Sequence, residues 1–264
     1  MKLPVALTIA GSDSGGGAGI QADLKTFAAL GVHGASALTA ITAQNTLGVT
    51  EIMELSPALV AAQIEAVMSD IGARAAKTGM LSSSEIIEVV VSAIAHFEIR
   101  NLVVDPVMVA KGGARLLRDD AVDALRLRLL PLAAVVTPNL PETEVLLGRP
   151  IRTLDERRQA ARDLVALGAR AAVVKGGHTD EDQAIDHYFD GVDLVELRSP
   201  RIATANTHGS GCVFSAAIAA DLAKGSDSLA AVHLAKEFVT GAIERSLELG
   251  RGHGPVNPMF RITG

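Results

Sequence analysis

Short apolar runs alternate along this chain with stretches of helical periodicity. Apolar residues at helical spacing fall between Ile20 and Leu30 and again between Ile64 and Ile71. Runs that are apolar on both faces, as in strands covered on both sides, occupy Val5–Ala10, Ser36–Ala43, Ala73–Thr78, Asn101–Asp105, Ala133–Thr137 and Ala171–Lys175. The alternation predicts an α/β, doubly wound sandwich with a mostly parallel central sheet and helices on both faces.

Capping and turn residues refine this pattern. Ser82 with Glu85, and Thr153 with Glu156, have the spacing of a capping box at a helix start. Residues 184–189 and 194–198 predict a β-hairpin whose turn contains Asp-Gly, and two further helices are expected over about 211–223 and 226–249. Because no linker, repeat or low-complexity tract interrupts the chain, we expect a single domain over residues 1–264.

Composition excludes several classes of protein. Apolar residues make up 48% of the 264 residues and charged residues 20%, which is enough apolar material for a sizeable core. A net charge of −6, no Trp and a single Tyr argue against binding nucleic acid. No apolar stretch is long enough to span a membrane. One cysteine cannot form an internal disulfide, so we expect a cytoplasmic protein.

A glycine-rich loop follows the first predicted strand and leads into a predicted helix. Residues 11–19 read Gly-Ser-Asp-Ser-Gly-Gly-Gly-Ala-Gly, which matches neither the phosphate loop of nucleotide triphosphatases nor the dinucleotide fingerprint. Five glycines in nine residues are more than a strand–helix turn needs. We therefore predict that this backbone approaches a small ligand closely.

A second glycine turn lies near the C-terminus. Gly209, Ser210, Gly211 and Cys212 run directly into the apolar segment 213–218. Free backbone N–H groups at the start of a helix form an anion site. The same position is expected to lower the pKa of the Cys212 thiol and so make a base or nucleophile available. The alternative is that Cys212 is an inert packing residue.

Polar residues follow three of the predicted strands. Asp105 ends one strand, Asn139 and Glu142 follow the next, and Lys175 ends another. Two carboxylates and an amide at one sheet edge suit Mg²⁺, which takes few protein oxygens together with phosphates and water. The alternative for Asn139 and Glu142 is a plain helix cap. Lys175 could meet phosphate oxygens, and no histidine spacing supports a zinc site.

These segments together resemble the hydroxymethylpyrimidine/phosphomethylpyrimidine kinases of thiamine biosynthesis, within the ribokinase superfamily. The resemblance covers nearly the whole chain. It rests on residues 8–13, 16–27, 42–46 (Thr-Ala-Gln-Asn-Thr), 77–81 (Lys-Thr-Gly-Met-Leu), 104–108, 137–139, 174–178 and 208–212 (His-Gly-Ser-Gly-Cys). There are two small departures, Ser14-Gly15 where the family often has Pro-Ser and Ser210 where Thr is usual.

The resemblance implies a ribokinase-like fold and a role for each of these residues. Gln44 would hydrogen-bond an aminopyrimidine. The rest of that pocket would be lined by Gly11, Asp23, Met80 and Val107. Gly209, Ser210, Gly211 and Cys212 would form the anion hole, with Cys212 where most relatives carry a catalytic Asp. The nucleotide would meet Lys175, Lys236 and Asn139, while Asp105 and Glu142 would serve the metal.

The implied reaction is ATP-dependent phosphorylation of 4-amino-5-hydroxymethyl-2-methylpyrimidine to its monophosphate and then its diphosphate. Mg²⁺ and ATP are the implied cofactor and co-substrate, and a homodimer is the implied assembly. Three alternatives remain open at this point. They are a pyridoxal/pyridoxine kinase of the same superfamily, a cysteine hydrolase using Cys212 with His208, and a pyrimidine-binding sensor without activity.

Overall fold

The computed structural model describes residues 3–110, 113–118, 120–177 and 183–262. His178, the last residue of the segment 174–178, lies outside them. In this part of the chain one sheet has eight strands in the order β10-β9-β8-β7-β6-β5-β1-β2. The strands are β1 Val5–Ala10, β2 His33–Leu38, β5 Ala75–Thr78, β6 Leu102–Val104, β7 Val135–Val136, β8 Ala172–Val174, β9 Gln183–Phe189 and β10 Leu194–Pro200.

All neighbouring strands from β2 to β8 are parallel, whereas β9 runs antiparallel to β8 and β10 antiparallel to β9. The mostly parallel sheet and the predicted hairpin, which forms one edge of that sheet, are therefore confirmed. Asp190 holds the hairpin turn because its carboxylate accepts the backbone N–H groups of Val192 and Asp193.

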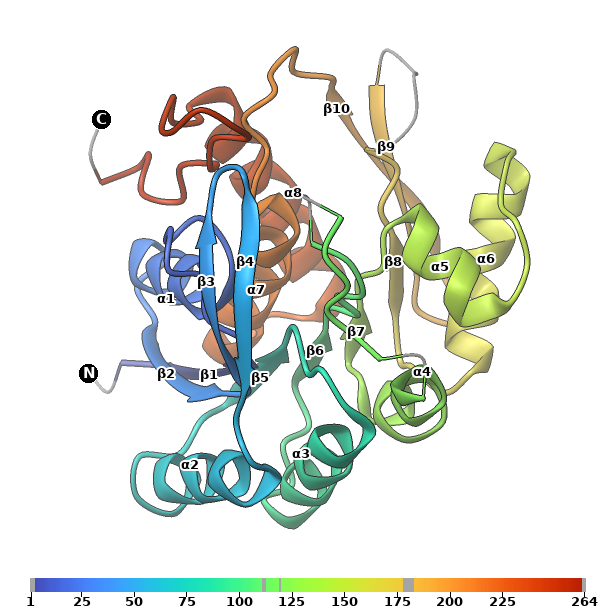
Figure 1. Ribbon diagram of the computed structural model, residues 1–264. Helices are drawn as coiled ribbons and strands as arrows, with labels where there is room; N and C mark the ends of the chain where they lie inside the picture. The colour runs from blue at the N-terminus through green and yellow to red at the C-terminus, as the bar shows by residue number, and fades with distance from the viewer. Residues whose placement is uncertain (1–2, 111–112, 119, 178–182, 263–264) are drawn as a thin grey trace.

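Helices cover both faces of the sheet (Figure 1). They are α1 Gly19–Ala29, α2 Pro57–Asp70, α3 Ser84–His96, α4 Ala121–Ala124, α5 Leu140–Leu147, α6 Leu154–Ala166, α7 Ser210–Lys224 and α8 Ser228–Glu244. Strand residues alternate between the two cores. Leu7 and Ile9 enter the core under α2, α3 and α6, whereas Ala6 enters the core under α1, α7 and α8.

The single strand predicted over Ser36–Ala43 is wrong, because the chain divides there at Thr39. β2 stays in the main sheet, while β3 Ala40–Asn45 pairs with β4 Gly48–Glu54 in a separate hairpin. Thr39 is completely buried and bonds three separate segments through Ala10, Met80 and Leu55. These bonds turn the chain out of the main sheet and place the β3–β4 hairpin over its carboxyl edge.

Two helix boundaries also differ from the sequence pattern. α3 is capped by Ser83, whose hydroxyl accepts the N–H of Ile86, and Ser82 instead has a positive φ of 64°. α8 ends at Glu244 rather than near residue 249. The capping box of Thr153 and Glu156 at the start of α6 is confirmed. Among the described residues no helix has the length and apolar content needed to cross a membrane.

Candidate active site

A cleft of about 700 Å³ opens at the carboxyl edge of the parallel strands. The edge where such strands end is where open α/β sheets bind their ligands. Loops after β1, β5, β6, β7 and β8, the β3–β4 hairpin and the start of α7 all contribute to its wall. Nearly every residue singled out in the sequence lines it, namely Gly11, Gln44, Met80, Asp105, Val107, Asn139, Glu142, Lys175, Gly209, Ser210, Gly211, Cys212 and Lys236.

The start of α7 is a ready-made anion site. Gly209 precedes the helix with φ of 79°, and no side chain caps the first turn. The first backbone N–H groups of a helix have no intrahelical acceptor, and the helix dipole adds partial positive charge there. A Cβ at Gly209 would lie 1.8 Å from the backbone oxygen of Gly17. The two glycine-rich loops are thus in close backbone contact at this point, which requires glycine at position 209.

Asp13 organises the first glycine loop. Its carboxylate accepts the backbone N–H groups of Gly15, Gly17 and Ala18 at 2.8–3.0 Å and lies 2.9 Å from Nε2 of His208. Burial raises the pKa of Asp13, but the bonds from His208 and the backbone outweigh burial and hold that pKa below its ordinary value. The Asp13–His208 contact joins residues 195 positions apart, and sequence reasoning missed it.

Gln44 is aimed into the cleft by its strand. The β3–β4 register shifts between Ala43 and Gln44, and such a bulge redirects the side chain that follows it. Ser14 clamps the Gln44 backbone, accepting its N–H at 2.8 Å and donating to its carbonyl at 2.7 Å. The Gln44 amide lies 3.3 Å from Thr42 Oγ1 and 3.5 Å from His208 Nε2. The first glycine loop therefore holds the main chain of Gln44, whereas Thr42 and His208 contact its side chain.

Asp105 and Lys175 form an ion pair on the cleft floor. The ammonium of Lys175 lies 3.1 Å from Asp105 Oδ1, and the hydroxyl of Ser215 donates to Oδ2 at 3.2 Å. Asp105 is only 2% exposed, although it borders the cleft. Burial lowers the pKa of Lys175, but the negative charges of Asp105 and Glu142 raise it by more. Lys175 thus keeps its positive charge beside the anion site.

Glu142 has two roles available to it. It completes a capping box with Asn139, in which the side-chain oxygen of each accepts the backbone N–H of the other at 2.8–2.9 Å. The cap interpretation is therefore correct. Burial raises the pKa of Glu142 to about 7, and Asp105 adds to this while Lys175 opposes it. A buried carboxyl group that also borders the cleft would bind a cation readily, because a cation relieves the cost of its charge.

The expectation that the Cys212 thiol has a lowered pKa is wrong. Burial raises the pKa of Cys212 to about 11, and the negative charges of Asp23 and Asp105 act in the same direction. Lys77 and the backbone N–H of Gly19 lower it, but by less. Removal of the sulfur from water thus outweighs its place at a helix start, and Cys212 is a neutral thiol at pH 7.

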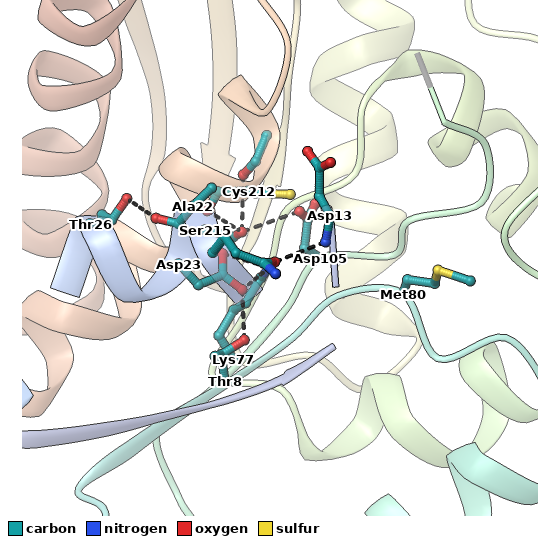
Figure 2. Close-up of polar contacts among 12 residues, drawn as sticks. Thr8, Asp13, Ala22, Asp23, Thr26, Lys77, Met80, Asp105, Cys212 and Ser215 are labelled. Carbon is teal, nitrogen blue, oxygen red and sulfur yellow. Dashed lines mark hydrogen bonds and ion pairs between the residues drawn. The ribbon is translucent and has the colours of Figure 1, made fainter. Parts of the chain in front are cut away.

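Asp23 does not line the cleft, contrary to the role that the resemblance implied. It is completely buried, and its carboxylate accepts bonds from the Lys77 ammonium at 2.9 and 3.1 Å and from Thr8 Oγ1 at 2.6 Å. Figure 2 draws these three residues in one cluster with Asp105, Ser215 and Cys212. Burial lowers the pKa of Lys77, but the charge and hydrogen bond of Asp23 together with the other negative charges nearby outweigh burial and raise that pKa. Asp23 therefore keeps Lys77 charged below the cleft.

Lys236 lies on α8 and lines another part of the cleft wall. Its ammonium donates to Asp186 Oδ2 at 2.8 Å and to the carbonyl of Ala184 at 3.1 Å. Asp186 also accepts the N–H of Gly176 at 2.9 Å, so it ties α8 to the loop after β8. Asp186 was not singled out in the sequence, because nothing in its local pattern separates it from other polar strand residues.

In this ribokinase-like fold, two glycine loops surround an anion site, and lysines lie across the same cleft. This arrangement is that of a kinase that acts on small molecules. The family model for phosphomethylpyrimidine kinase matches residues 13–257. This chain belongs to the phosphomethylpyrimidine kinase family.

Three relatives illustrate this membership. A hydroxymethylpyrimidine/phosphomethylpyrimidine kinase from Rhizobium meliloti is 54% identical, with 97% of each chain covered. The thiamine biosynthesis bifunctional protein ThiED from Geobacter sulfurreducens is 53% identical over 95% of this chain, and the chain spans about half, 51%, of that protein's length. An ADP complex of Bacillus subtilis pyridoxal kinase has a TM-score of 0.92 at 42% identity and covers 99% of this chain and 100% of its own.

Proposed function

We propose that this chain uses ATP to phosphorylate the hydroxymethyl group of 4-amino-5-hydroxymethyl-2-methylpyrimidine, and then the resulting monophosphate to the diphosphate. One observation carries the proposal. The anion site of Gly209–Cys212 and the amide of Gln44 face the same cleft, and His208 directly joins them. A carboxamide matches the adjacent donor and acceptor of an aminopyrimidine edge. The anion site supplies what a transferring phosphoryl group needs.

The nucleotide lies, in this proposal, on the side of Lys175, Lys236 and Asn139. The two lysines border the cleft and hold positive charge beside it, each against a buried carboxylate. A chain of net charge −6 cannot attract ATP by its overall field, so local cations must do so. The ADP complex of the pyridoxal kinase relative supports use of an adenine nucleotide.

Mg²⁺ fits the acidic edge of the cleft. Among the described residues no group of three or more metal-binding side chains is present. Two carboxylates, Asp105 and Glu142, do border the cleft, and Mg²⁺ bound to phosphates needs only one or two. We propose that these two residues hold it, directly or through water. When bound, Mg²⁺ neutralises phosphate charge and orients the phosphates.

Transfer then depends mainly on position and charge. The backbone N–H groups of Gly211 and Cys212 would stabilise charge that develops on the phosphoryl group, by roughly 3–4 kcal/mol per donor in a dry site. Gln44 holds the ring so that the hydroxymethyl oxygen faces this site. The neutral Cys212 thiol cannot accept the hydroxyl proton, so only its thiolate form, a minor one at pH 7 because the pKa is raised to about 11, could act as the base. In the second step the acceptor is already an anion, so a base matters less.

Pyridoxal kinase activity is the second candidate, and the likeness to the Bacillus subtilis pyridoxal kinase favours it as a side activity. The hydrolase alternative is disfavoured. The thiol of Cys212 has its pKa raised to about 11. A cysteine nucleophile needs the opposite arrangement, with a lowered pKa and a base beside it. The sensor alternative is disfavoured because the cleft retains its charged residues.

Mass spectrometry of the products tests the proposal. Incubation of the chain with Mg-ATP and the hydroxymethylpyrimidine should give the monophosphate first and the diphosphate later. Pyridoxine in a parallel reaction measures the side activity. ADP without either phosphorylated pyrimidine would contradict the proposal, and phosphopyridoxine alone would favour the second candidate.

Gln44→Ala tests the pyrimidine site separately. Loss of a polar partner in a desolvated pocket costs roughly 1–3 kcal/mol, so KM for the pyrimidine should rise about 5- to 150-fold. KM for ATP should change little, because Gln44 is not on the nucleotide side. Steady-state kinetics with each substrate varied measures both values. Equal rises in the two KM values would contradict the assignment.

We further propose a single-domain cytoplasmic homodimer that binds neither nucleic acid nor membranes. Ile41 and Met53 are paired across the β3–β4 hairpin and are 49% and 64% exposed, which favours a second copy packing there. Light scattering of the purified chain would measure its mass in solution, and a monomer at micromolar concentration would contradict the dimer.

A further inference from the structure

Asp13, His208, Gln44 and Thr42 form a chain of polar contacts along one wall of the cleft. Asp13 is only 1% exposed and receives four N–H donors, three from the backbone and one from His208. The amide of Gln44 lies within this chain, between His208 and Thr42, and it meets the pyrimidine in the proposed function on which this inference rests.

The proton on His208 is determined by Asp13. A carboxylate is an acceptor only, and the bonds around Asp13 keep it ionised. Nε2 of His208, 2.9 Å from Asp13 Oδ2, must therefore carry a hydrogen and donate it. The atom of Gln44 that lies 3.5 Å from the same nitrogen is consequently best placed as an acceptor, which is the amide oxygen.

On the other side of the Gln44 side chain, Thr42 favours the same orientation of the Gln44 amide. Its hydroxyl has one proton, which it donates to the carbonyl of Ser12 at 2.8 Å. The Gln44 atom 3.3 Å from Thr42 Oγ1 must then be a donor, which is the amide nitrogen. The structure has these two amide atoms exchanged, so that donors face each other near His208. Rotation of the amide by 180° removes that conflict without moving any other atom.

We propose that His208 is a positioning residue for substrate specificity: held by Asp13, it keeps the Gln44 amide oxygen on the His208 side and the amide nitrogen on the Thr42 side. Neither contact is short, so the pair sets a preference between two orientations. With this orientation a ligand that contacts Gln44 meets the amide oxygen, an acceptor, on the His208 side and the amide nitrogen, a donor, on the Thr42 side. A 4-aminopyrimidine edge, with an amino donor beside the ring-nitrogen acceptor N3, matches this order.

The 4-oxo counterpart of the substrate is the natural probe, because its edge has the reversed order. Its N3 carries a hydrogen and its exocyclic oxygen accepts. The wild-type chain should therefore strongly prefer the 4-amino compound. In His208→Leu only Thr42 still favours one orientation of the amide, so the ratio of kcat/KM for the 4-amino over the 4-oxo compound should fall, by up to about 10- to 100-fold, the discrimination typical of a bidentate base contact.

Further variants separate positioning from general damage. His208→Gln keeps an N–H donor near the same place and should retain most of the discrimination. Thr42→Val removes the other partner with little change in shape and should lower the ratio as well. In a Gln44→Ala background, His208→Leu should not change the ratio further, because it acts through Gln44. His33→Leu alters an exposed histidine on β2 and should leave the ratio unchanged.

Each outcome bears on one claim. A folded His208→Leu variant that loses activity equally on both compounds, with an unchanged ratio, would overturn the inference and leave the proposed function standing. If His208→Leu does not fold, an unchanged ratio in Thr42→Val would overturn it instead. A wild-type chain that phosphorylates neither pyrimidine would overturn the proposed function and this inference with it.

Discussion

Cys212 is the single cysteine of the chain, so thiol reagents report on it alone. Because burial raises its pKa to about 11, only about one thiol in 10⁴ is ionised at pH 7. Alkylation by iodoacetamide, which needs the thiolate, should be slow at neutral pH. Its rate should rise about tenfold per pH unit up to roughly pH 10. A rate that reaches its plateau near pH 8 would contradict the raised pKa.

Substitution at Cys212 tests whether the sulfur accepts a proton during catalysis. If the minor thiolate form of Cys212 is the base, Cys212→Ala should lower the rate of the first phosphorylation, by less than the roughly 10²-fold of a fully ionised base, and the second by less still. Cys212→Asp should recover part of the first rate, because a carboxylate replaces the thiol as base. Single-turnover rates with each acceptor measure the difference. An unchanged first step in Cys212→Ala would make Cys212 a packing residue.

Individual residues differ in how far the sequence predicts them. The family resemblance implied that Gln44 and the turn of Gly209–Cys212 share one site, and both line the cleft. The contact of Asp13 with His208 spans 195 positions and leaves no local signal. Asp23 was misplaced for a related reason. Its burial depends on Lys77 and Thr8, two partners from different strands.

Elements were predicted well wherever the period of apolar residues is unambiguous. The parallel strands and the capping box at Thr153 followed from local pattern. The division at Thr39 did not, since the run Ser36–Ala43 is continuous in polarity and its break depends on bonds to distant loops. The β3–β4 hairpin, which carries Gln44, was consequently missed as an element although Gln44 itself was found.

The pairing of β9 with β10 encloses a histidine that makes the protein sensitive to acid. His187 is completely buried, and neither ring nitrogen has a hydrogen-bond partner. Its surroundings are Glu196 of β10, 3.7 Å away, Arg157 and Arg158 of α6, and the adjacent Asp186. Burial lowers the pKa of His187, and the two arginines add to this while the carboxylates oppose it.

The unfolded chain therefore binds one more proton at this site than the folded chain once the pH falls below the unfolded pKa of about 6.5. The free energy of unfolding should decrease by up to roughly 1.4 kcal/mol per pH unit from there down to the folded pKa, where this contribution levels off. His187→Leu should remove this component, whereas His33→Leu, at an exposed site, should not. Urea unfolding at several pH values between 7 and 5 measures the slopes. Parallel slopes in wild type and His187→Leu would contradict the argument.

At the scale of the whole molecule, two apolar cores share one sheet. The strands β5 to β8 are buried on both faces, so each of them contributes side chains to both cores. If either layer of helices unfolded, it would expose one face of the sheet on which the other layer also packs. The cleft lies at the edge of this shared sheet, and its walls come from loops of both layers. Activity should therefore be lost only when the whole structure unfolds.

Two natural probes test this cooperativity. Tyr188, the single tyrosine, is completely buried on β9, and its hydroxyl lies 2.6 Å from Ser228 Oγ of α8. Cys212 reports from the start of α7, beside β1 and β5. If residues 1–264 form one domain, tyrosine fluorescence, thiol accessibility and far-ultraviolet circular dichroism should give coincident midpoints in urea. An adenine nucleotide with Mg²⁺ should raise all three midpoints together, because a ligand that binds only the folded state stabilises the whole cooperative unit. A separate, earlier transition for either probe would mean that the β9–β10 side and the α7 side unfold as independent units.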